Sequence, residues 1–312
     1  MESRRVGRSG LTVSRLGLGT MTWGRDTDAD DAAAQLESFV GSGGTLIDTA
    51  NIYGDGDAEA IIGTLVPDVV PRSDVVLATT TVGVGGGRGR LLAALDESLR
   101  RLGTDHVDLW QVHGYDGAVP FEETCAVLRT AVDSGRARYV GVSGFTGWQL
   151  ATFATALRSP AGVSLVSAEA EYSLADRSPE ESLLPAAHAH GVGLIGWAPL
   201  GRGVLTGKYR HGTPADSRGA SPHFARYVGR HRTDHTARIV EAVATAAEGL
   251  GTSPLAVACA WVRDRPGVSA VVVGARDNAQ LQGSLAGQDL VLPAEIVSAL
   301  ADVSDPDGDE DL

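Results

Sequence analysis

Short apolar runs rich in β-branched residues alternate with amphipathic helical patterns along this 312-residue chain. The runs with the length and composition of buried strands are residues 16–20, 45–50, 74–81, 106–112, 138–143, 163–170, 192–197 and 269–273. The clearest helical patterns between them are residues 90–102, 121–133, 179–190 and 236–250. Strands that alternate strictly with helices favour an α/β fold with a parallel sheet. Eight such units predict a closed (β/α)8 TIM barrel, and periodicity alone leaves an open sheet as the alternative.

Three segments fall outside this repeat. Residues 4–6 and 11–13 flank a turn at residues 7–10, which predicts an N-terminal β-hairpin. Residues 201–232 form a long connection after the seventh predicted strand, and a loop of this length in a compact domain is usually functional or mobile. Residues 302–312 form an acidic tail that we expect to fray. No linker divides the chain, so we expect one domain, residues 1–312.

The net charge of the chain limits the classes of partner that we expect it to bind. The formal net charge is −13 and the sequence pI is about 5.0, which disfavours nucleic acid or an anionic membrane surface as the main partner. We therefore expect a small-molecule substrate, and the sequence indicates no oligomeric state. The first ten residues hold no apolar run, and Cys125 and Cys259 both fall in helical patterns. These features favour a cytoplasmic setting without disulfides.

Polar side chains stand where two of the predicted strands end. Asp48 and Tyr53 belong to the stretch LIDTANIYG at the end of the second strand, and His113 ends the fourth. Catalytic groups of (β/α)8 barrels gather at the C-terminal ends of the strands, so we expect these three side chains to converge. Taken singly, such an Asp is often a turn or cap residue and such a Tyr is often structural.

Longer stretches resemble a known protein family. They are LIDTANIYG, SLRRLGTDHVDLWQVHG, GVSGF, EYSLADRSPEESLLPAAHAHGVGLIGWAPLGRGVLTGKY and VVVGARDNAQLQGSLA. In this order, from about residue 4 to residue 300, the chain resembles the aldo-keto reductase family of the long-loop bacterial type. The resemblance implies a (β/α)8 barrel with an N-terminal β-hairpin cap and an NADPH-dependent oxidoreductase.

The resemblance also implies catalytic roles. Tyr53 would be the general acid for a carbonyl oxygen, Asp48 its electrostatic partner and His113 the donor that orients the substrate. A phenol with a pKa near 10 exchanges protons poorly at neutral pH unless a nearby cation shifts it. In the family, a lysine at the end of the third strand provides this cation.

That lysine is missing from the predicted tetrad. The third strand ends in three threonines, which puts Thr80 in the lysine position, or Thr81 if the loop is counted from its glycines. The chain has a single lysine, Lys208, and it belongs to the connection after the seventh strand. Arg88 or Arg90 would be a substitute cation, although an arginine stays charged and is shaped for forked contacts with anions.

The resemblance further implies a site for NADPH (NADP+). The residues that match the family's cofactor segments are Gly19, Thr20, Met21, Ser143, Glu169, Trp197, Pro199, Leu200, Gly201, Arg202, Gly274, Arg276, Gln280 and Ser284. Trp197 would stack on the nicotinamide, and Arg276 at a helix N-terminus suits a 2′-phosphate. Gly144 and Glu169 stand where the family commonly has Asn and Gln, and Ala198 replaces a Ser. These departures predict that cofactor binding is weakened or lost.

Trp23 and Tyr115 are the predicted substrate-pocket residues, and no metal site is expected. Three functions stay open at this point. The first is NADPH-dependent reduction of an aldehyde or ketone with an atypical tetrad. The second is a non-redox dehydratase, isomerase or cyclase that uses Tyr53, His113 and the neighbouring carboxyl groups. The third is a catalytically silent binding or regulatory protein, since a fold does not fix a function.

Overall fold

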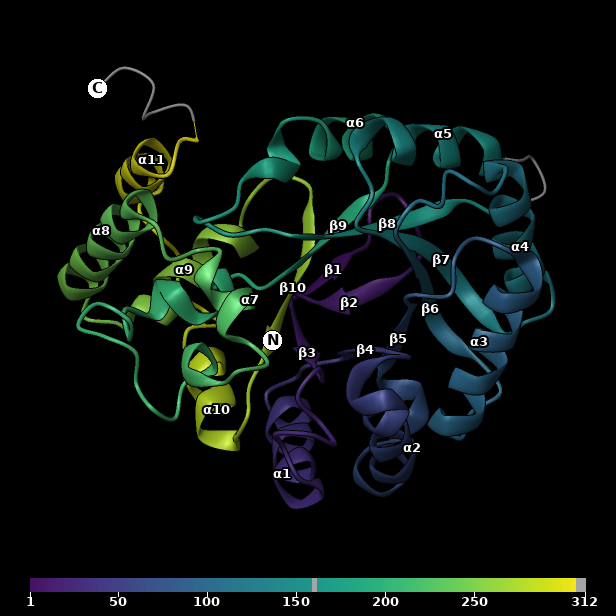
Figure 1. The fold of residues 1–312 in the computed structure, drawn as a ribbon, viewed down its shortest axis with the longest axis horizontal. Helices are drawn as coiled ribbons and strands as arrows, with labels where there is room; N and C mark the ends of the chain where they lie inside the picture. Colours follow the sequence, from purple (N-terminus) through teal and green to yellow (C-terminus); the bar gives the residue numbers. More distant parts are fainter. Residues whose placement is uncertain (159–161, 307–312) are drawn as a thin grey trace.

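The computed structural model describes residues 1–158 and 162–306, and its strands close into a barrel (Figure 1). The barrel strands are β3 (Leu16–Gly19), β4 (Leu46–Ala50), β5 (Val76–Thr81), β6 (Val107–His113), β7 (Ala137–Ser143), β8 (Leu165–Glu171), β9 (Gly193–Trp197) and β10 (Val268–Gly274). Neighbouring strands are parallel, and β10 pairs with β3 to close the ring. The predicted closed barrel is confirmed, and the open-sheet alternative is wrong. Every predicted strand is present, with ends shifted by a few residues.

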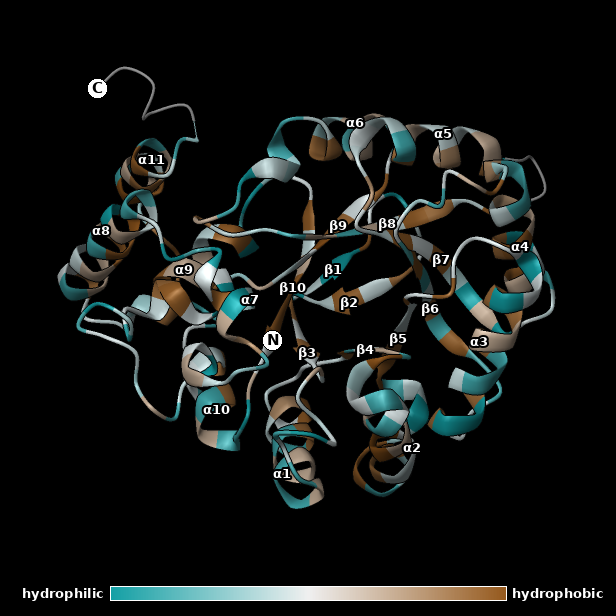
Figure 2. Cartoon of the chain, viewed as in Figure 1, coloured by the Kyte–Doolittle hydropathy of each residue, from teal (hydrophilic) through white to brown (hydrophobic). Residues whose placement is uncertain are grey.

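Helices surround the barrel (Figure 1). They are α1 (Ala29–Gly41), α2 (Asp57–Val69), α3 (Arg88–Leu102), α4 (Phe121–Asp133), α5 (Gly147–Leu157), α6 (Leu183–His190), α7 (Ala225–Gly229), α8 (Asp234–Leu250), α9 (Pro254–Arg263), α10 (Asn278–Ala286) and α11 (Ala294–Val303). In α3, buried Leu91, Leu95 and Leu99 recur at a spacing that places them on one face. Figure 2 shows mixed colouring on these helices and hydrophobic colouring along much of the barrel wall.

The N-terminal hairpin covers the end of the barrel at which the strands begin. Strands β1 (Ser3–Arg5) and β2 (Thr12–Ser14) pair antiparallel, one residue away from the predicted ranges 4–6 and 11–13. The shift arises because Val6 and Leu11 turn inward and pack, with Val13, against apolar side chains of the barrel interior. The hairpin is confirmed, and it positions no residue of the site described below.

Two predicted segments differ in detail. The predicted helix 179–190 is divided into a 3-10 turn, η3 (Ser178–Glu180), and the helix α6. Tyr172 and Arg177 donate to the Glu180 carboxylate and keep this first turn separate from α6. The long connection (residues 201–232) contains η4 (Gly201–Thr206), η5 (Arg218–Ala220) and α7. Of the predicted acidic tail, residues 302 and 303 complete α11, and residues 307–312 lie outside the described residues.

The cysteines are core residues of helices, as predicted. Cys125 lies in α4 and Cys259 in α9, and both are buried free thiols. Burial raises the pKa of Cys125 to about 11 and that of Cys259 to about 12, so neither is a nucleophile at neutral pH. Within the described ranges, no helix has both the length and the apolar character that a membrane span requires.

Candidate active site

A cavity of about 690 Å³ lies where the barrel strands end, and the long connection forms part of its wall. A cavity of this size holds a cofactor or a drug-sized ligand. The predicted site residues that line it are Gly19, Met21, Asp48, Tyr53, Thr80, His113, Ser143, Glu169, Trp197, Pro199, Leu200, Arg202, Gly274, Arg276, Gln280 and Ser284. The structure therefore brings together residues that are up to 265 positions apart, from Gly19 to Ser284.

The two predicted substrate-pocket residues lie elsewhere. Trp23 is 0% exposed, and its indole Nε1 donates to Gln35 Oε1 at 3.1 Å. Tyr115 packs edge-on against Phe145 and Trp148. Neither residue is among those that line the cavity, so the structure does not bring them into this site, and their pocket role stays a prediction. Aromatic side chains next to a barrel rim can turn into the helix layer as readily as into the cavity, and here they pack in the layer.

Two predicted cofactor residues also lie behind the cavity wall. Thr20 is buried, and its hydroxyl donates to the backbone oxygen of Asp48 at 3.0 Å. Gly201 is buried with φ +54, and a Cβ there would meet Ala175 Cβ at 3.1 Å. These residues shape neighbouring segments without lining the cavity.

We call Asp48, Tyr53, Thr80, His113 and Glu169 the inner end of the cavity. Strand register brings them together: Ala50 pairs with Thr80, and Ser143 pairs with both His113 and Glu169. Tyr53 follows β4 in η1 (Tyr53–Gly56), where the next two residues both have positive φ and turn the chain sharply. The predicted convergence of the strand-end side chains is therefore present in the structure.

A glutamine beneath the inner end fixes two of its side chains. Gln111 Nε2 donates to Glu169 Oε2 at 3.2 Å and to Thr80 Oγ1 at 3.3 Å. Ser167 Oγ in turn donates to Gln111 Oε1 at 2.9 Å. Sequence reasoning missed Gln111 because it does not reach the cavity. The available signal was a fully polar side chain inside the apolar run of β6.

The inner end is rich in carboxyl groups. Burial and then the charge of Glu169 raise the pKa of Asp48 well above its usual range. Burial raises the pKa of Glu169 to about 7, although hydrogen bonds from Ser143, Thr80 and Gln111 oppose the shift. The pKa of Tyr53 is also raised, by burial first and then by Asp48, Glu169 and Tyr227. A phenol in this setting keeps its proton firmly.

The geometry decides which threonine faces the cavity. Thr80 lines it, whereas Thr81 accepts a hydrogen bond from the buried indole of Trp110 at 2.9 Å. Arg88 and Arg90 are exposed and lie outside the cavity lining, so neither is positioned as a substitute cation beside Tyr53. Among the described residues, none of the groups that shift the pKa of Tyr53 is a Lys or an Arg.

We call Lys208, Arg218 and Arg276 the outer end of the cavity, which all three residues line. Burial lowers the pKa of Lys208, and the charges of Arg218 and Arg276 lower it further. Three cations that influence one another electrostatically across a cavity have the charge that suits a multiply charged anion. Arg218 was not predicted, because nothing in the sequence of a long loop indicates which of its arginines turns inward.

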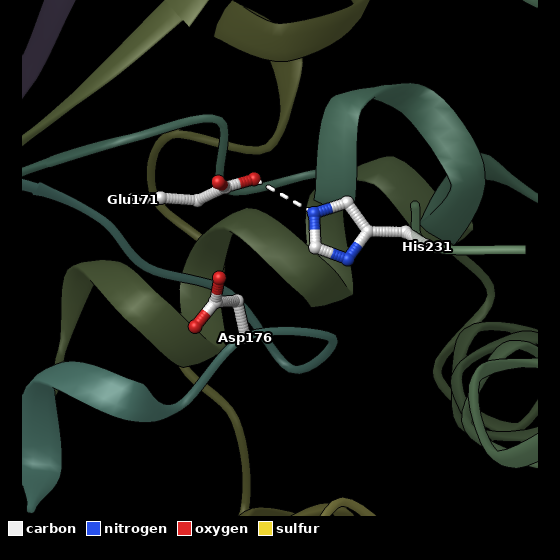
Figure 3. A group of neighbouring side chains, drawn as sticks. All are labelled: Glu171, Asp176 and His231. Atoms are coloured by element: carbon white, nitrogen blue, oxygen red, sulfur yellow. Dashed lines mark hydrogen bonds and ion pairs between the residues drawn. The ribbon is translucent and has the colours of Figure 1, made fainter. Parts of the chain in front are cut away.

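A buried ion pair holds both ends of the long connection. Arg202 donates to both carboxylate oxygens of Glu171: its Nε lies 2.7 Å from Oε1, and a second guanidinium nitrogen binds Oε2. His231 Nε2 lies 2.8 Å from the same Oε1. Figure 3 shows the His231 ring turned towards the Glu171 carboxylate, with the Asp176 carboxylate below it. These three side chains have the composition of a metal site, but the Arg202 fork already occupies both oxygens of Glu171. We therefore describe Glu171, Arg202 and His231 as the clasp of the long connection.

Comparison with known proteins agrees with this geometry. The model of the Aldo/keto reductase family matches residues 15–305. The chain is 34% identical to the uncharacterized oxidoreductase YrpG of Bacillus subtilis, over 99% of this chain and 98% of that one. It is 34% identical to a probable voltage-gated potassium channel subunit beta of Oryza sativa, over 96% and 95%. It is 32% identical to L-glyceraldehyde 3-phosphate reductase of Escherichia coli, over 90% and 86%.

Proposed function

This chain belongs to the aldo/keto reductase family of oxidoreductases, and we propose that it uses NADPH to reduce the carbonyl group of an aldehyde or ketone. The observation that carries the proposal is the cavity with two chemically different ends. Its outer end holds three cations, and its inner end holds a protonated phenol beside an imidazole. A long anionic cofactor and a small neutral carbonyl need this division of one cavity.

The outer end supports NADP(H), which members of the family generally use. Lys208, Arg218 and Arg276 would meet the phosphate groups, and Arg276 would distinguish NADPH from NADH through the 2′-phosphate. Trp197 also lines the cavity, and its ring would stack on the nicotinamide. When bound, the cofactor supplies the hydride.

The inner end supports proton donation from Tyr53. With its pKa raised, the phenol stays protonated, donates a hydrogen bond to the carbonyl oxygen and gives up its proton only to a much stronger base. The alkoxide-like oxygen that forms on hydride addition is such a base. The reverse direction needs a tyrosinate, which burial and then Asp48 and Glu169 disfavour. The site therefore favours reduction over oxidation.

His113 would orient the substrate. It lines the cavity, its Nδ1 lies 3.0 Å from Ser143 Oγ, and its Nε2 has no hydrogen-bond partner within the described part of the chain. Gly144 leaves room for the ring, because a Cβ at that position would lie 3.0 Å from His113 Cε1. An Asn at this position would make a tight contact that requires the imidazole to move by a few tenths of an ångström.

The test is a titration of the purified protein with NADPH and, in parallel, NADH, followed by quenching of its five tryptophans. We expect saturable quenching with a clear preference for NADPH. Arg276→Gln should weaken NADPH binding about tenfold or more, since a charge-assisted bond contributes roughly 1.5–3 kcal/mol, and should leave NADH binding nearly unchanged. Arg100→Gln is the matched control, because Arg100 pairs with Glu97 on the surface of α3, away from the cavity.

Turnover is then measured on a panel of carbonyl substrates. The panel begins with small aldehydes and includes a phosphorylated one, because one relative is named as a glyceraldehyde 3-phosphate reductase. Saturable NADPH binding with consumption of NADPH and carbonyl supports the proposal. Failure to bind NADPH at millimolar concentration would overturn it and would leave acid–base catalysis or a binding role on the same scaffold.

A further inference from the structure

A chain of hydrogen bonds connects a buried carboxyl group to the imidazole of the inner end. Strand pairing places Ser143 beside Glu169, where its hydroxyl opposes the rise in the pKa of the Glu169 carboxyl, and the same hydroxyl oxygen lies 3.0 Å from His113 Nδ1. Strand register makes the chain continuous, since His113 pairs with Ser143 and Ser143 pairs with Glu169. The other imidazole nitrogen, Nε2, belongs to a ring that lines the cavity.

One hydroxyl hydrogen cannot serve both neighbours at once. When Glu169 is ionised, its carboxylate only accepts, so Ser143 must donate to Glu169. The Ser143 oxygen then accepts from His113 Nδ1–H, and a neutral imidazole leaves Nε2 as a bare acceptor towards the cavity. When Glu169 is protonated, it donates to Ser143, Ser143 donates to His113 Nδ1, and Nε2 carries the hydrogen.

We propose that the protonation state of Glu169, transmitted by Ser143, sets which nitrogen of His113 carries its proton and so whether His113 presents a donor or an acceptor to the substrate. The change balances with one proton taken up at Nε2 from the cavity. The Nδ1 proton passes to Ser143 Oγ, and the Ser143 proton passes to the Glu169 carboxylate. Glu169 and Ser143 are thus positioning residues that act through His113.

The surroundings of Glu169 allow this titration. Gln111 and Thr80 both place a donor on Oε2, which leaves Oε1 to carry the proton. The ionisable groups that face the carboxyl are Asp48 from β4 and Tyr53 from η1, and burial raises the pKa of each. Arg202, the nearest arginine of the long connection to β8, is held by Glu171.

The pH range in which the His113 tautomer changes follows from the pKa values of Glu169 and His113. Glu169 titrates near pH 7, whereas burial lowers the pKa of His113. The imidazole is therefore mostly neutral while Glu169 changes charge, so a change of tautomer, rather than a change of ring charge, follows the carboxyl. Below pH 7 the site presents Nε2–H, which suits a carbonyl oxygen. Above pH 7 it presents a lone pair, which suits the hydroxyl of an alcohol.

The direct test uses nitrogen-15 NMR of the imidazoles in the cofactor-free protein, with His113 identified among the eight histidines by its loss in His113→Gln. We expect Nε2 of the wild type to change from protonated to unprotonated between pH 6 and pH 8.5, with Nδ1 changing in the opposite sense. In Glu169→Gln and in Ser143→Ala this change should disappear, because the first variant cannot ionise and the second breaks the chain. A thermal melt confirms that each variant is folded.

Two results would overturn the proposal: a wild-type His113 that keeps one tautomer throughout this range, or a change that survives in Glu169→Gln. Either variant alone decides the question if the other fails to fold. The effect on the substrate rests on the proposed function, and there we expect the KM for a carbonyl to rise about tenfold from pH 6 to pH 8.5 in the wild type and to stay flat in Glu169→Gln. The NMR result stands even if NADPH does not bind, so the two failures are distinguishable.

Discussion

The two ends of the cavity differ in the sign of their charge and in the origin of their residues. The inner end is built from strand ends and η1, and its ionisable groups are carboxyls, a phenol and an imidazole. The outer end takes two of its three cations, Lys208 and Arg218, from the long connection. The first set is fixed by barrel geometry, and the second depends on how one loop is held in place.

This difference separates two tasks. In the proposed function the cations bind the anionic cofactor, and they are not among the groups that shift the pKa of Tyr53. In the proposed function the inner end donates the proton, and burial, followed by the two carboxyl groups, raises the pKa of the phenol. Changes at one end should therefore leave the task of the other end intact, and each prediction below tests this independence.

The largest effect is expected at Tyr53. Tyr53→Phe removes the proton donor, and we expect kcat for carbonyl reduction to fall by about 10²–10⁴-fold, the usual contribution of a positioned general acid. The Kd for NADPH should change less than twofold, because the phenol belongs to the inner end. Steady-state kinetics and the tryptophan titration measure the two quantities.

Tyr139→Phe is the control for this substitution. Tyr139 lies on β7 and packs against the apolar cluster around the N-terminal hairpin, outside the cavity lining. It should keep wild-type kcat. If Tyr53→Phe also kept its activity, Tyr53 would not be the acid, and the assignment of tasks to the two ends would fail.

The next effect is expected at the clasp. Glu171→Gln leaves the buried guanidinium of Arg202 without its counter-charge, and removing one partner of a buried pair typically costs about 3–5 kcal/mol. We expect faster amide hydrogen exchange in residues 201–232 and weaker NADPH binding, because the long connection carries two of the outer cations. Exchange at β4 and β5 should not change, since these strands hold the inner end.

Glu97→Gln provides the comparison, since Glu97 pairs with arginines on the exposed face of α3. It should change neither the exchange pattern nor the affinity. Uniformly faster exchange across the whole barrel in Glu171→Gln would mean that the clasp stabilises the fold as a unit, and the distinction between a rigid inner end and a tethered outer end would be lost.

Lowering the pH should weaken the clasp reversibly, and its effect on amide exchange should be smaller than that of Glu171→Gln. Burial opposes ionisation of Glu171, but hydrogen bonds from His231 and Arg202 outweigh burial and lower its pKa. A lowered folded-state pKa stabilises the protein above the ordinary carboxyl value of about 4.3, and this contribution is lost as the pH falls through the lowered value. Exchange in residues 201–232 should therefore stay slow at pH 5 and rise only at clearly lower pH. A rise already near pH 6 would contradict the assignment to Glu171.

The fold and the inner end follow from local sequence patterns. Each barrel strand is a short apolar run, and parallel closure then brings Asp48, Thr80 and His113 to one rim regardless of the loops between them. The hairpin was misplaced by one residue because its register depends on Val6 and Leu11 entering the barrel, which is a tertiary contact.

The outer end and the aromatic residues were less predictable for the same reason. The clasp joins Glu171 to residues 31 and 60 positions later, and no local pattern encodes such a pairing. Trp23 lies beside the rim in the sequence, but its side chain packs in the core against Gln35. Gln111 shows the opposite case, because a polar side chain in a buried strand signals a hydrogen-bond network even when its partners are unknown.

The smallest effect is expected when a substitution places a cation at the inner end, which tests the contrast between the two ends directly. Thr80→Lys puts an ammonium group beside Glu169 and near Asp48, where it should lower the pKa of Tyr53 and make tyrosinate more accessible. We expect alcohol oxidation at pH 9 to gain about tenfold relative to carbonyl reduction, the effect of roughly one pKa unit. Thr80→Met, similar in length without the charge, should give no gain. An equal gain in both variants would assign the effect to packing, and no gain in either would mean that proton donation at this site does not depend on the charge around Tyr53.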